Sequence, residues 1–120
     1  MRILIGDDAA VARALLARIL SSAGHEVAGE AATAQELLAR SEELEPDLVA
    51  LDSRLPPRGG LAVIESLLAL PKPPGILFIA ALGEFDLLQA ALRAGARGGF
   101  ARPFAPAAVV ETLRGFARTE

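Results

Sequence analysis

A regular alternation of two kinds of apolar segment most constrains how this chain can fold. Short apolar runs, several of them rich in β-branched residues, lie at 3–5, 26–29, 48–51, 76–80 and 99–101. The segments between them carry apolar residues three or four positions apart, such as Val11, Leu15 and Ile19. The short runs are typical of strands buried on both faces, and the longer spacing is typical of amphipathic helices. The sequence therefore predicts five strands and five helices in strict alternation.

Residues that start or stop helices support these limits. Asp8 is an expected N-cap for the first helix, and Thr33 with Glu36 forms an expected capping box for the second. Gly95 is placed to end the fourth helix, and Pro106 suits the first turn of the fifth. Each helix is thus bounded by residues with a physical reason to be there.

The alternation also predicts the topology. Strands that alternate with helices form a parallel sheet with right-handed crossovers and helices on both faces. Five strands in 120 residues fit an α/β three-layer sandwich with the flavodoxin-like strand order 2-1-3-4-5. The length suits a single domain over residues 1–120. In such sheets the functional groups lie at the carboxyl ends of the strands, near the first and third.

Composition excludes several kinds of function. The chain has no cysteine and one histidine, which excludes disulfides, thiolate metal sites and multi-histidine metal sites. The net charge of −3 gives no drive towards nucleic acid or an anionic membrane, so neither is expected as a partner. No apolar run approaches the roughly 18 residues of a membrane span, and no signal peptide precedes the first acids. A cytoplasmic location is expected.

Three carboxylates follow neighbouring strands of the predicted sheet. Asp7 and Asp8 end the first strand, and Asp52 ends the third. Either end alone would be consistent with a helix cap or a turn residue, but together the three acids should share one pocket and repel one another. A hard cation such as magnesium (Mg²⁺) relieves that repulsion, and a carboxylate beside it can act as a nucleophile towards a phosphoryl group.

With these acids in place, the chain resembles the receiver domains of two-component response regulators, the CheY-like family, over essentially its whole length. The matching pieces are Ile3 to Asp8, Pro46 to Asp52, Leu55-Pro56, Gly60-Leu61, Ala94 to Ala96, and Pro103-Phe104. The resemblance implies a signalling domain rather than an enzyme, which promotes only its own phosphorylation and dephosphorylation.

The resemblance also implies a role for each site residue. Asp52 would accept a phosphoryl group from a phosphohistidine on a sensor histidine kinase or a phosphotransfer protein. Asp8 and Asp52 would ligate Mg²⁺ directly, together with the main-chain carbonyl of Arg54, and Asp7 would act largely through water.

Three positions depart from the family pattern. Ala80 stands where receivers carry Thr or Ser, Arg102 replaces the usual Lys, and Gly99 replaces the usual aromatic residue. Ala80 has no hydroxyl to donate, whereas Arg102 keeps the charge as a planar fork. Three roles are open for its guanidinium: contact with the phosphoryl group, solvation by water, and pairing with Asp52 at rest. Phe100 falls one position after Gly99, so it should point to the opposite face of the strand and pack in the core.

Three functions remain open on this sequence. The first is a phosphorylatable switch whose output uses docking of the first helix or a homodimer through helix four, strand five and helix five. The second is a pseudo-receiver, a protein-interaction module that works without phosphorylation. The third, a flavodoxin-like enzyme or nucleotide binder, has little support because the chain lacks a glycine-rich phosphate loop with its Lys-Ser/Thr.

Overall fold

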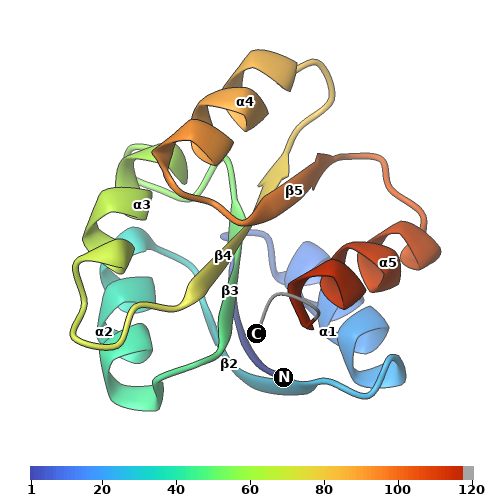
Figure 1. Cartoon of the computed structure of the whole chain (residues 1–120), viewed down its shortest axis with the longest axis horizontal. Helices are drawn as coiled ribbons and strands as arrows, with labels where there is room; N and C mark the ends of the chain where they lie inside the picture. The colour runs from blue at the N-terminus through green and yellow to red at the C-terminus, as the bar shows by residue number, and fades with distance from the viewer. Residues whose placement is uncertain (118–120) are drawn as a thin grey trace.

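The computed structural model of this chain describes residues 1–117, and within them strands and helices alternate five times as predicted (Figure 1). The strands are β1 (Arg2–Gly6), β2 (Glu26–Ala31), β3 (Leu48–Asp52), β4 (Gly75–Ala80) and β5 (Gly98–Ala101). The helices are α1 (Ala10–Ser22), α2 (Ala34–Leu44), α3 (Leu61–Leu68), α4 (Phe85–Ala94) and α5 (Pro106–Ala117). In this part of the chain no helix has both the length and the apolar character needed to cross a bilayer.

All neighbouring strands are parallel, and their order is β2-β1-β3-β4-β5, which confirms the flavodoxin-like prediction. The register between β1 and β3 pairs Ile3 with Leu48 and Gly6 with Leu51. The residues that follow these last partners are Asp7 and Asp52. Strand pairing alone therefore brings the acids of two distant segments to one edge of the sheet.

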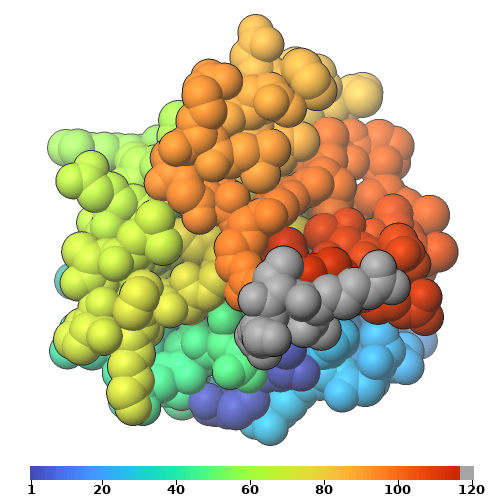
Figure 2. All heavy atoms as spheres, in the orientation of Figure 1, coloured from blue at the N-terminus to red at the C-terminus, as the bar shows by residue number. Residues whose placement is uncertain are grey.

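The helices cover the sheet on both faces. α1 and α5 lie on one side, and α2, α3 and α4 lie on the other (Figure 1), so that their side chains close around the strands in the space-filling view (Figure 2). Alternate strand residues supply the two cores: Ile3 and Ile5 pack towards α1 and α5, and Leu4 packs towards α2 and α3. Each such buried side chain stabilises the fold by about 1.5–3 kcal/mol, which explains the continuous apolar runs.

The helix limits follow the predicted residues with one exception. The hydroxyl of Thr33 accepts from the Glu36 amide at 3.2 Å, α4 ends at Gly95 with φ 122°, and α5 begins at Pro106. The prediction that Asp8 caps α1 is wrong, because Ala9 holds that position without a side-chain hydrogen bond.

The reason lies in the neighbouring acid. A carboxylate oxygen of Asp7 accepts from the amide of Ala9 at 2.9 Å, in the two-residue pattern of an Asx turn. The chain therefore turns through Asp7 before the helix begins, and Asp8 remains exposed.

The edge strand β5 packs closely at Gly99, which pairs with Phe78 of β4. A Cβ at Gly99 would contact the carbonyl oxygen of Phe78 and would lie 2.7 Å from Leu88 Cδ1 of α4. Phe100 lies on the other face, as strand alternation predicts, where it is partly buried and packs against Phe104 with tilted rings whose centroids are 4.6 Å apart. Leu88 thus fills the space beside Gly99, and a larger residue does not fit there.

Candidate functional site

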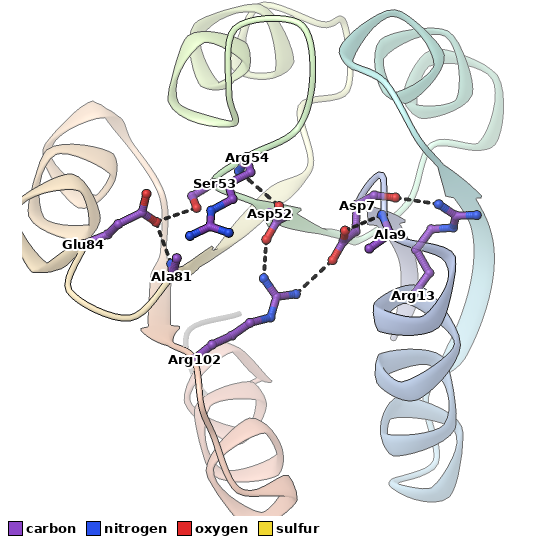
Figure 3. Close-up of polar contacts among 9 residues, drawn as sticks. All are labelled: Asp7, Ala9, Arg13, Asp52, Ser53, Arg54, Ala81, Glu84 and Arg102. Atoms are coloured by element: carbon purple, nitrogen blue, oxygen red, sulfur yellow. Dashed lines mark hydrogen bonds and ion pairs between the residues drawn. The ribbon is translucent and has the colours of Figure 1, made fainter.

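The three predicted acids meet at the carboxyl ends of β1 and β3. Asp7 and Asp52 are buried and Asp8 is exposed, and each offers a carboxylate oxygen within 4.8 Å of the others. Figure 3 shows the Asp7 and Asp52 side chains turned towards each other from the two strand ends. The predicted convergence of Asp7, Asp8 and Asp52 on one pocket is confirmed.

Arg102 lies between the two buried carboxylates. One guanidinium nitrogen donates to Asp52 Oδ1, and the other donates to Asp7 Oδ2 at 2.9 Å (Figure 3). Burial alone would lower the pKa of Arg102, but its hydrogen bonds with Asp52 and the charges of both acids outweigh burial and raise that pKa. Of the three expected roles, this structure shows the pairing with Asp52, and the second contact with Asp7 was not predicted.

Further donors hold each buried acid in place. The amide of Arg54 donates to Asp52 Oδ2 at 3.0 Å, and Arg13 donates to the carbonyl of Asp7 at 2.7 Å. Arg13 also forms an ion pair with Glu30 at 2.9 Å, which ties α1 to β2. The loops that present the acids are therefore fixed by hydrogen bonds to neighbouring elements.

The end of β4 presents a methyl group where the resemblance to receiver domains would place a hydroxyl. Ala80 is fully buried and has no side-chain donor. In its neighbourhood, Glu84 Oε1 accepts from the Ser53 hydroxyl at 2.7 Å and from the Ala81 amide at 2.6 Å (Figure 3). The hydrogen bond from Ser53, and then that from Ala81, lower the pKa of Glu84, aided by the charge of Arg54 and opposed by burial. Sequence reasoning missed this contact, since no spacing pattern links these residues.

The donor set of the acid cluster fits Mg²⁺. It consists of the carboxylate oxygens of Asp7, Asp8 and Asp52, and hard oxygen ligands are what this ion prefers. The guanidinium of Arg102 compensates two of the same charges in this structure. A divalent ion and the Arg102 guanidinium would therefore compete for the carboxylates of Asp7 and Asp52.

Comparison with known proteins decides the family. The model of the response regulator receiver domain matches residues 3–114 of the 120. The chain belongs to the response regulator receiver domain family. Among its relatives are the chemotaxis protein CheY of Thermotoga maritima, 38% identical, and that of Bacillus subtilis, 31% identical; each alignment covers 93% of both chains.

Solved receiver structures agree with this assignment. The receiver domain of NtrX from Brucella abortus superposes with a TM-score of 0.89 at 29% identity, covering 98% of this chain and 99% of that one. A response regulator from Chloroflexus aurantiacus gives a TM-score of 0.88 at 29% identity, covering 95% and 94%. This chain is thus a CheY-like receiver domain of two-component signalling, a family in which phosphoacceptance and Mg²⁺ binding at the acidic pocket are general.

Proposed function

We propose that this receiver is a phosphorylatable switch in which Asp52 accepts the phosphoryl group of a phosphohistidine on a sensor histidine kinase or phosphotransfer protein. The observation that carries the proposal is the buried Asp52 carboxylate, held between the guanidinium of Arg102 and the amide of Arg54. A carboxylate oxygen of Asp52 attacks phosphorus, an O–P bond forms and the P–N bond of the donor breaks. The imidazole leaves with the electron pair and takes up a proton. The domain is then a signalling element that changes only its own phosphorylation state, not an enzyme acting on other substrates.

Each acid has its own part in holding Mg²⁺. Asp8, Asp52 and the carbonyl of Arg54 would ligate the ion, and Asp7 would act through water. When bound, Mg²⁺ neutralises charge as the phosphoryl group arrives. Asp8 suits direct ligation because it is exposed at the pocket.

Arg102 takes the part that a Lys plays in other receivers. Its planar fork already presents two donors to two carboxylates, and the same donors suit phosphoryl oxygens. With about a third of its side chain exposed, the guanidinium can turn from Asp7 to the new anion without leaving the pocket.

The surface beside the pocket is suited to a phosphodonor. Arg102 lines a hollow of about 420 Å³ together with the apolar side chains Leu15, Leu82, Pro103 and Phe104. Leu15 and Leu82 are 58% and 80% exposed, so an incoming protein would cover apolar surface at the same time as it delivers the phosphohistidine. We propose two routes by which the phosphorylated domain passes on its signal. One is docking of α1 to a partner, and the other is a homodimer through α4, β5 and α5.

A second candidate function has its own observations. Position 80 lacks the hydroxyl, position 99 lacks the aromatic ring, and Arg102 forms ion pairs with both buried acids, which is compatible with a pseudo-receiver. Such a module would bind its partner with Asp52 unmodified.

Intact mass separates the two functions. The chain is incubated with Mg²⁺ and phosphoramidate or acetyl phosphate, beside Asp52→Asn as the matched isosteric control. A switch gains the mass of one phosphoryl group, and Asp52→Asn does not. No adduct and no binding of beryllofluoride would favour the pseudo-receiver.

A further inference from the structure

The loop between β4 and α4 is fastened to the residue beside the acceptor. Ser53 follows Asp52 directly, is 5% exposed, and donates its hydroxyl proton to Glu84 Oε1. The same oxygen accepts from the amide of Ala81, the residue that follows β4. One carboxylate therefore joins the acceptor loop, the end of β4 and the start of α4 (Figure 3).

This contact is not a helix cap. Glu84 occupies the N-cap position of α4, where a carboxylate would ordinarily accept from the first free amides of its own helix. Its side chain makes no such hydrogen bond and turns back towards Ser53 instead. The first turn of α4 is thus held through a link to the phosphorylation site.

The Ser53 hydroxyl and the Ala81 amide can each donate one strong hydrogen bond at a time. The hydroxyl of Ser53 and the amide of Ala81 carry one proton each. A phosphoryl group on Asp52 would bring about two negative charges and three acceptor oxygens to this edge of the sheet. These oxygens compete with the Glu84 carboxylate for both protons, and their charge also repels it.

We propose that the carboxylate of Glu84 is the moving part of a switch. It holds Ser53 and Ala81 while Asp52 is unmodified, and it is displaced when a phosphoryl group on Asp52 draws on these donors. This inference rests on the proposed function and deepens it. It supplies a route from acceptor to helix that needs no hydroxyl on Ala80.

The surface that would respond lies on either side of Glu84. Leu82 is 80% exposed and Phe85 is 67% exposed, and both are large apolar side chains. The backbone carbonyl of Glu84 also accepts from the amide of Leu88 at 3.0 Å, so release of the loop reaches the first turn of α4. Displacement of Glu84 therefore repositions two exposed apolar residues at once.

Amide NMR of the ¹⁵N-labelled chain tests this route. Spectra are recorded before and after loading with phosphoramidate and Mg²⁺, and intact mass is measured on the same samples. The variants are Glu84→Ala, Glu84→Gln and Ser53→Ala, and the matched controls are Asp86→Asn on the same helix turn and Ser66→Ala on α3. Asp86 and Ser66 are exposed.

In the wild-type chain and both controls, loading should shift the amide resonances of Ala81 and of residues 82–88. In Glu84→Ala the resting Ala81 resonance should already lie near its loaded position, and loading should shift residues 85–88 several-fold less. Glu84→Gln, which keeps an acceptor but loses the charge, and Ser53→Ala should fall between.

Two results would overturn the inference in distinguishable ways. If Glu84→Ala forms the phosphoryl adduct and residues 85–88 shift as in the wild type, Glu84 is only a loop contact. If the wild type forms no adduct, the proposed function fails and the switch fails with it.

Discussion

Two buried carboxylates and one guanidinium form the electrostatic centre of this domain. Asp7 and Asp52 are 5% and 3% exposed, so neither charge is well solvated. Arg102 supplies one nitrogen to each and carries the compensating charge into the pocket. Removing one partner of such a group leaves the other charges buried and uncompensated, which is costly.

Replacing Arg102 with Ala should therefore change two properties in opposite directions. The metal-free protein should lose about 1–3 kcal/mol of unfolding free energy, because hydrogen bonds to charged groups are lost. Mg²⁺ should bind more tightly, because no internal cation competes for the acids. Urea unfolding and Mg²⁺ titration measure both, with Arg93→Ala on the exposed face of α4 as the control. Unchanged or weaker Mg²⁺ binding would contradict competition for these acids.

Replacing Asp8 with Ala should weaken Mg²⁺ binding without a large loss of stability. Asp8 is exposed and does not cap α1, so its carboxylate is expected to act mainly on the ion. Isothermal titration calorimetry with Mg²⁺ measures the change in affinity. Asp86→Ala is the control for a lost negative charge. An unchanged affinity would remove Asp8 from the ligand set.

The pKa of Glu84 predicts how stability depends on pH. The hydrogen bonds from Ser53 and Ala81 lower this pKa below its ordinary value of 4.5 in the folded state. The stabilising contribution is therefore complete above about pH 4.5 and is lost as the pH falls through the folded-state pKa. The groups facing Glu84 are Ser53, the Ala81 amide and the charge of Arg54.

Denaturation series between neutral and acidic pH should show this loss in the wild type. In Ser53→Ala the stability should fall less over the same interval, because the largest cause of the lowered pKa is gone. Parallel curves for the two proteins would show that this hydrogen bond does not stabilise the carboxylate.

At the scale of elements, α4 and β5 pack closely together because position 99 is a glycine without a side chain. Leu88 of α4 occupies the space next to Gly99, and the carbonyl of Phe78 closes it from β4. Here α4 and β4 pack closely against Gly99, so this position has no aromatic ring that could change its orientation on signalling.

Gly99→Ala should destabilise the domain by about 1–3 kcal/mol, since the added methyl group overpacks a closed site. Gly115→Ala is the matched control, because a Cβ there meets nothing within 4 Å and the residue lies in α5. That substitution should stabilise by about 0.5–1 kcal/mol through helix propensity. Thermal unfolding measures the stability of both variants. If Gly99→Ala were stabilised as much as Gly115→Ala, the contact between α4 and β5 would be loosely packed.

Local patterns predicted the elements well because each depends on neighbours in sequence. Apolar periodicity set the strands and helices, and Thr33, Gly95 and Pro106 marked helix ends through their own backbone chemistry. Contacts between loops were beyond such reasoning. Ser53 and Glu84 lie 31 positions apart, and Arg102 and Asp7 lie 95 apart, so only the folded geometry brings them together.

At the scale of the whole molecule, strand order accounts for the site. The parallel pairing of β1 with β3 and of β3 with β4 aligns three strand ends, and β5 adds Arg102 from the edge. For this reason the acid cluster could be predicted from the order of strands alone. The chemical event that we propose at this edge is the phosphorylation of Asp52.

Chemical trapping of the acyl phosphate tests that assignment most directly. The chain is loaded with phosphoramidate and Mg²⁺, reduced with borohydride, which converts a phosphorylated aspartate to homoserine, and digested with trypsin. Asp52 lies in the peptide 41–54, and Asp7 and Asp8 lie in the peptide 3–13, so the two sites separate. We expect homoserine at position 52 and at neither of the other two. Homoserine at position 7 or 8, or no conversion at position 52, would contradict the account.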